Sequence, residues 1–128
     1  MKTIFKSIIL LPTLANLAAA SLSDADKQFL AGYEKIHVAL AADDLAAAKK
    51  AAANLGSEAS ALAKSNSLEQ ARTAFADLSA KAEKLAAGQP GYYVAHCPMV
   101  NKDWVQTSDK IDNPYLGKKM ANCGEIKK

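Results

Sequence analysis

The segment 67–91, SLEQARTAFADLSAKAEKLAAGQPG, decides how the chain folds. Ser67 followed by Gln70 has the spacing of a capping box, in which side chains satisfy the free N–H groups of a first helical turn. Gly88 and Pro90 are the usual stop signals at the other end. Between these signals, apolar residues recur every three or four positions: Leu68, Ala71, Phe75, Leu78, Ala82 and Leu85. The segment therefore predicts an amphipathic helix with one buried face.

The same signals predict a helix that begins near residue 24. Ser23 and Asp26 have the spacing of another capping box. The apolar stripe that follows is Phe29, Tyr33, Ile36 and Leu40. His37 lies beside this stripe, where a lone histidine is more often packed or solvated than a ligand. We therefore favour a structural interpretation of His37.

A further helix is predicted between these two. Asp43 and Asp44 supply an N-cap and favourable charge for its first turn. Its apolar stripe keeps a three-four spacing across Gly56: Leu45, Ala48, Ala52, Leu55, Ala59 and Leu62. This continuity predicts one helix to about Lys64, bent at the glycine rather than ended there.

Three amphipathic helices joined by short polar turns predict a mainly α fold. We expect an antiparallel three-helix bundle over residues 24–87, with a C-terminal extended segment and a short fourth helix. Stripes that alternate leucine with alanine bury little area per turn, so the core should be thin. The tail, residues 92–124, should pack on the bundle to complete a single domain over residues 21–128.

The first 20 residues have the features of a signal peptide. Lys2 and Lys6 precede an apolar run over residues 8–17, and residues 18–20 are the small alanines that a signal peptidase requires. The run is too short to cross a hydrocarbon layer of ~30 Å as a helix. We expect cleavage after Ala20, a periplasmic mature chain and no membrane insertion.

Charge and motif content exclude two classes of function. The chain has 16 Lys and Arg residues against 13 Asp and Glu, and the loss of Lys2 and Lys6 would leave a net charge of about +1. No cationic stripe of the kind that binds phosphate is present, so we expect no nucleic-acid partner. Paired carboxylates, a phosphate loop and a serine motif are also absent, so we expect no enzymatic activity.

The tail carries the residues with distinctive chemistry. Residues 91–96 favour extended chain, and Pro98 disfavours helix at Cys97, so the segment should stay extended through Met99. In extended chain, Cys97 and Met99 point the same way and His96 points the other way.

A short helix should follow Asn113 and Pro114, which form an N-cap and first helical position. Its predicted inner face is Leu116, Met120 and Cys123, and Gly124 should close it. Two sulfur atoms would then come from the extended segment and two from the helix.

Thiolate, thioether and imidazole groups are the ligands that select copper(I) or silver(I) over calcium or magnesium. The candidate metal ligands are Cys97, Met99, Met120 and Cys123, with His96 as a fifth donor. Trp104 is a candidate ring to shield the metal. The two cysteines have an alternative, because a disulfide closing a loop of about 26 residues would contribute roughly 3.5 kcal/mol. The residues alone leave both interpretations open.

Three parts of the chain resemble a bacterial domain family of unassigned function. They are residues 33–44, residues 71–79 and the tail. The matching tail motifs are His96-Cys97-Pro98-Met99, Trp104-Val105-Gln106, Ile111-Asp112-Asn113-Pro114-Tyr115-Leu116-Gly117 and Met120-Ala121-Asn122-Cys123-Gly124. Members of this family occur as small exported proteins and as domains appended to CusB-type periplasmic adaptors of heavy-metal efflux pumps.

The resemblance implies a periplasmic helical domain that handles copper or silver, with Cys97, Met99, Met120 and Cys123 carried over as its site residues. We therefore expect a copper(I)- or silver-binding chaperone or buffer. Its partner would be an efflux-pump adaptor or another periplasmic protein. The alternative is a disulfide-stapled interaction module that binds no metal.

Overall fold

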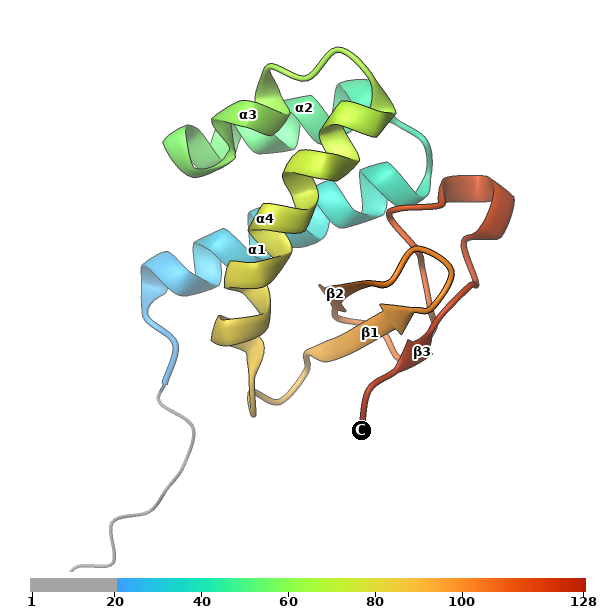
Figure 1. Ribbon diagram of the computed structural model, residues 1–128. Helices are drawn as coiled ribbons and strands as arrows, with labels where there is room; N and C mark the ends of the chain where they lie inside the picture. Colours follow the sequence, from blue (N-terminus) through green and yellow to red (C-terminus); the bar gives the residue numbers. More distant parts are fainter. Residues whose placement is uncertain (1–20) are drawn as a thin grey trace, which may run out of the picture.

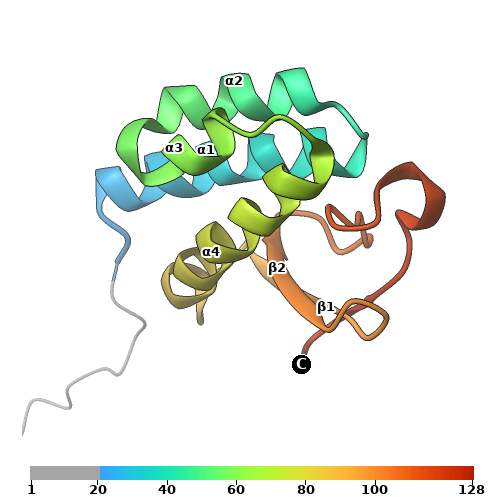
Figure 2. The same ribbon diagram turned by 45° about the horizontal axis from the view of Figure 1, so that its top comes forward.

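The computed structural model describes residues 21–128, so the predicted signal peptide lies outside the described residues. The helices are α1 (Asp24–Ala41), α2 (Leu45–Leu55), α3 (Ser60–Ala63) and α4 (Leu68–Ala86), and the strands are β1 (Tyr93–Cys97), β2 (Lys102–Gln106) and β3 (Glu125–Ile126). Two 3-10 turns are η1 (Gly56–Ala59) and η2 (Gly117–Met120). Helix α4 packs against the other helices and against the sheet (Figures 1 and 2).

The predicted helix starts are confirmed by their hydrogen bonds. Ser23 and Asp26 form a full capping box, in which each side chain accepts from the backbone N–H of the other residue. The Ser67 hydroxyl accepts from the N–H of Gln70 at 3.1 Å, whereas the Gln70 side chain caps Asn66 instead of Ser67. The α4 cap therefore lacks one of the two hydrogen bonds of a capping box, the bond from the N–H of Ser67 to the side chain of Gln70.

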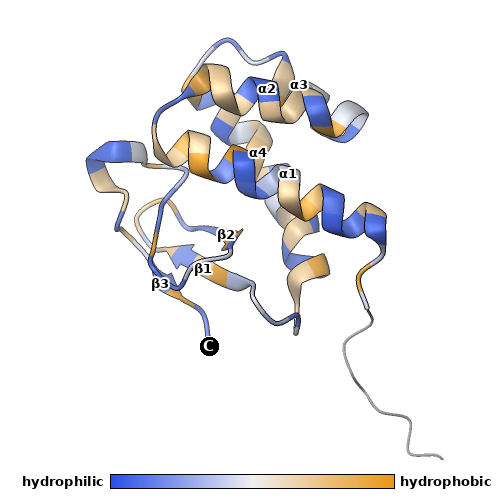
Figure 3. Ribbon diagram, turned by 180° about the vertical axis from the view of Figure 1, so that it is seen from behind, coloured by the Kyte–Doolittle hydropathy of each residue, from blue (hydrophilic) through white to orange (hydrophobic). Residues whose placement is uncertain are grey.

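The predicted stripes form the core, and the mainly helical class is confirmed. Twelve of their residues are buried: Phe29, Tyr33, Ile36, Leu40, Ala48, Ala52, Ala59, Leu62, Ala71, Phe75, Leu78 and Ala82. Figure 3 shows hydrophobic residues alternating with hydrophilic ones along the helices, as expected for elements with one buried face.

The prediction of one helix from residue 45 to about Lys64 was wrong. Helix α2 ends at Leu55, and Gly56 adopts φ 80° and ψ −142°, which no helix can continue. A 3-10 turn and the four-residue α3 follow. The apolar phase survives this break because Ala59 and Leu62 are still buried, so periodicity alone did not reveal where the backbone turns.

The tail forms a three-stranded antiparallel sheet, and the fold is therefore not purely a helical bundle. Its strand order is β2-β1-β3. The segment containing Trp104 is strand β2, for which the sequence predicted no strand, and it pairs with β1 so that Ala95 lies opposite Trp104. Trp104 and Val105 are both buried, because helix α4 covers β2 (Figure 2).

The predicted short fourth helix is also corrected. Only the 3-10 turn η2 forms between Pro114 and Gly124. Asn113 nevertheless caps this segment, because its Oδ1 accepts from the N–H groups of Tyr115 and Leu116 at 2.8 and 3.0 Å. The capping signal was correct, but the following residues make a single turn.

A buried tyrosine ties the sheet to the helices. The Tyr33 hydroxyl accepts from the backbone N–H of Val105 at 3.1 Å and lies 2.7 Å from the Ser79 hydroxyl. Because this N–H is buried, Tyr33→Phe should lower the free energy of unfolding by about 1–3 kcal/mol. Urea denaturation would measure the loss, and Tyr93→Phe, at an exposed tyrosine, is the matched control. Equal stability of the two variants would contradict this role for Tyr33.

Candidate functional site

The two cysteines meet because β3 pairs with β1. The antiparallel register sets His96 opposite Glu125, so the chain just before β3 runs beside the end of β1. The Sγ atoms of Cys97 and Cys123 lie 3.3 Å apart, and both cysteines are free. This separation exceeds the ~2.05 Å of a disulfide bond, so the two sulfur atoms are not bonded to each other in this structure.

Hydrogen-bond donors surround the sulfur of Cys97. Burial alone would oppose ionisation of this thiol, because a charge is poorly solvated there. The backbone N–H groups of Val100 and Met99 donate to the sulfur, and so do the Cys123 thiol and the Asn113 side chain. Together these donors outweigh burial and hold the pKa of Cys97 below its ordinary value.

The pKa of Cys123 shifts in the opposite direction to that of Cys97. Its thiol donates to the sulfur of Cys97, and this hydrogen bond, with burial and the charge of Cys97, raises the pKa of Cys123. Cys97 therefore ionises first and Cys123 keeps the shared proton. A soft cation that displaces this proton would find two sulfur ligands side by side.

The two methionines lie close to the thiols along the chain but remain at the surface. Met99 is 63% exposed and Met120 is 38% exposed. The prediction that Met99 shares the face of Cys97 was wrong, because β1 ends at Cys97 and residues 98–101 turn away. Each methionine is tied to a cysteine through its backbone: the carbonyl of Met120 accepts from the N–H of Cys123 at 3.0 Å, and the N–H of Met99 donates to the sulfur of Cys97.

His96 lies on the opposite side of the strand from Cys97. Its Nδ1 is 2.5 Å from Oδ1 of Asp103, and Lys127 reaches the other oxygen of Asp103 at 2.9 Å. The opposed orientation of His96 and Cys97 agrees with the alternation expected of a strand. His96 is therefore separated from the dithiol in this structure.

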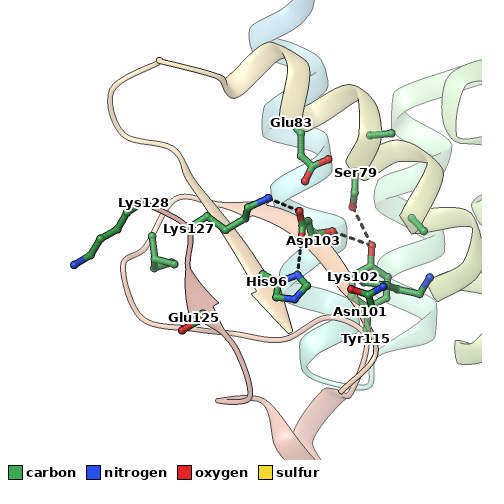
Figure 4. A pocket seen from close by; sticks show the side chains of 13 residues that line it. Ser79, Glu83, His96, Asn101, Lys102, Asp103, Tyr115, Glu125, Lys127 and Lys128 are labelled. Atoms are coloured by element: carbon green, nitrogen blue, oxygen red, sulfur yellow. Dashed lines mark hydrogen bonds and ion pairs between the residues drawn. The ribbon is translucent and has the colours of Figure 1, made fainter. Parts of the chain in front are cut away.

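His96 and Asp103 line a surface pocket of about 860 Å³ between α4 and the sheet (Figure 4). Burial would raise the pKa of Asp103, but Lys127 and His96 lower it overall. Burial and the neighbouring carboxylate of Asp103 raise the pKa of Glu83. The pocket thus contains acids and bases that already neutralise one another.

Trp104 and His37 have structural roles. Trp104 is fully buried, and its indole N–H donates to Gln106 at 2.8 Å. The Nε2 atom of His37 lies 2.6 Å from the backbone carbonyl oxygen of Asp112, and its Nδ1 lies 3.3 Å from Oε2 of Glu34. His37 therefore anchors the loop that leads into Asn113.

The environment of His37 predicts a pH-dependent stability. Burial would lower the pKa of His37, but the Glu34 carboxylate and the Asp112 carbonyl raise it overall. A raised folded-state pKa stabilises the fold at pH values below about 6.5, and this contribution is lost as pH rises through the folded value. Urea denaturation across this range should show a weaker pH dependence in His37→Gln. Lys35→Gln, on the exposed face of α1, is the control, and an unchanged slope in His37→Gln would contradict the assignment.

Asn113 was recognised from the sequence as a helix cap only. Its side chain also donates to the backbone carbonyl of Cys123 at 2.8 Å. No local spacing signals this contact, because it joins residues on opposite sides of a turn.

Within residues 21–128, no group of three or more His, Cys, Asp or Glu side chains is placed to hold a metal ion. That finding concerns His, Cys, Asp and Glu side chains only. It therefore says nothing about a site made of two cysteines and one or two methionines. No helix of the described part of the chain combines the length and apolarity needed to cross a membrane. Comparisons with protein-family models, curated proteins and solved structures find no match.

Proposed function

We propose that the protein binds one copper(I) or silver(I) ion through the thiolates of Cys97 and Cys123. The observation that carries this proposal is the pair of free thiols 3.3 Å apart, one of which has its ionised form stabilised by hydrogen bonds. Thiolates are soft donors and prefer soft cations.

The sulfur separation is compatible with a shared metal ion. Two thiolates bound to one tetrahedral ion, with bonds of about 2.3 Å, lie about 3.8 Å apart. The observed distance of 3.3 Å requires the sulfur atoms to separate by only about half an ångström. Met120 is the thioether that we favour as a third ligand, because its side chain is the less exposed of the two.

A chaperone or buffer in copper or silver tolerance is the role that we favour. The exposed thioethers of Met99 and Met120 could exchange the ion with a partner. The resemblance to domains appended to heavy-metal efflux adaptors supports a periplasmic partner of that kind, with the predicted signal peptide directing export.

Competition with a chromogenic copper(I) chelator tests the proposal. Reduced protein should remove one equivalent of copper(I) from the chelator, and protein alkylated at both cysteines should remove none. Binding should weaken as pH falls, because protons compete for the thiolates. Failure of the reduced protein to remove copper(I) from the chelator would contradict the proposal.

The same distance favours a second candidate, a disulfide-stapled interaction module without metal. The sulfur atoms would need to approach by about 1.3 Å to form the bond. Intact mass of protein isolated from the periplasm, with and without alkylation, separates the two candidates. A mass unchanged by alkylation supports the staple, whereas addition at two thiols supports the dithiol.

A further inference from the structure

Asn113 is a fully buried amide that joins the two segments bearing the cysteines. Its Nδ2 donates to the carbonyl oxygen of Cys123 at 2.8 Å, and its backbone N–H donates to the carbonyl of Ala121 at 2.7 Å. These two bonds fix the chain that carries Cys123 against residue 113.

The carbonyl side of the same amide fixes the turn that follows. Oδ1 accepts from the N–H groups of Tyr115 and Leu116. Burying an amide is costly unless its polar atoms are bonded, and here both ends of the side chain have partners. A residue of this kind holds one geometry, because movement would break several bonds together.

Asn113 also contacts the first thiol. Its side chain donates a hydrogen bond to the sulfur of Cys97, so the one amide reaches both cysteine segments. A neutral donor suits this position. It stabilises the thiolate without placing a positive charge that would repel a metal cation.

We propose that Asn113 is a positioning residue of the two thiols: its amide holds the segment that carries Cys123 beside Cys97. Its effect on metal binding rests on the proposed function, whereas its effect on the thiols does not. The anchor extends to α1, since His37 bonds the carbonyl of the preceding residue, Asp112.

Three variants test this role. Asn113→Ser removes the amide donor without adding charge, and its hydroxyl can still accept from the following N–H groups. Asn113→Asp keeps the Oδ1 acceptor but loses the donor. Asn122→Asp adds the same charge at an exposed position next to Cys123 and serves as the matched control.

The first readout needs no metal. The Cys97–Cys123 disulfide should form several-fold more slowly in both Asn113 variants when the reduced protein is exposed to a fixed concentration of oxidised glutathione, because Cys123 is no longer held beside Cys97. The second readout is silver(I) affinity, which should fall about tenfold or more in both variants, the typical effect of losing a residue that supports a ligand. Asn122→Asp should remain close to wild type in both measurements.

A rate of disulfide formation in the Asn113 variants that matches Asn122→Asp would overturn the inference, whatever the metal affinity. If the oxidation slows while even the wild-type protein fails to bind silver(I) or copper(I), the positioning role stands and the proposed function fails. Circular dichroism checks the fold, and Asn113→Ser carries the comparison if Asn113→Asp does not fold.

Discussion

Replacing Cys97 with serine should reduce copper(I) affinity by more than a hundredfold. The hydroxyl that replaces the sulfur is a hard, protonated donor, and only Cys123 would remain as a thiolate. The loss should exceed the roughly 10- to 100-fold effect of removing a residue that merely supports a ligand. Competition with a copper(I) chelator under reducing conditions measures it.

Cys123→Ser should produce a comparable loss, because two sulfur ligands are required. Met120→Leu should weaken binding less, and Met99→Leu least, since Met99 is the more exposed thioether. His96→Gln is the control within the tail, because His96 lies away from the thiols and bonds to Asp103. Retention of wild-type affinity by Cys97→Ser would contradict the proposed site.

Replacing Arg72 with methionine should cause the largest loss of stability among the substitutions considered. Its guanidinium donates to the backbone carbonyls of Leu40 and Pro114 at 2.8 and 2.7 Å. It therefore joins α4 to the end of α1 and to the tail. Two carbonyl groups would lose a charged donor, so the free energy of unfolding should fall by about 2–4 kcal/mol. Arg72 also pairs with Asp43 and lowers the pKa of that exposed carboxylate.

Urea denaturation of Arg72→Met and Lys81→Met would test this difference. Both residues lie on α4, but Lys81 pairs with Glu58 at the exposed surface, where ion pairs contribute little. Lys81→Met should therefore change stability by less than about 1 kcal/mol. Equal losses in the two variants would show that Arg72 does not join the tail to the helices.

The helices were predictable because their signals are local. The caps at Ser23 and Ser67 and the apolar stripes lie within single elements, where spacing determines which residues share a face. Gly56 was misjudged because a glycine can bend or end a helix without changing the apolar phase on either side. Its positive φ angle is a property of the folded backbone.

The sheet was harder to predict because its pairing is not local. Trp104, Val105 and Gln106 are buried in succession beneath α4, so β2 lacks the alternation of a half-exposed strand. Strand β3 has only two residues, Glu125 and Ile126, and is too short to leave a pattern. Its pairing with β1 nevertheless brings the cysteines together.

Only the part of the candidate site that depends on local spacing was predictable from the sequence. Alternation along β1 separates His96 from Cys97 and could be read from the sequence. The exposure of Met99 depends on where the strand ends, and the role of Asn113 depends on a contact across a turn. The metal ligand set remains a prediction, and the 3.3 Å sulfur separation is the observation that focuses it on Cys97 and Cys123.

X-ray absorption at the copper edge tests the central claim most directly. Reduced protein loaded with one equivalent of copper(I) should show a first shell made of sulfur, including the two thiolates, and Cys97→Ser should lose part of that shell. A first shell of nitrogen or oxygen atoms in the wild-type protein would contradict the claim that Cys97 and Cys123 together hold the metal.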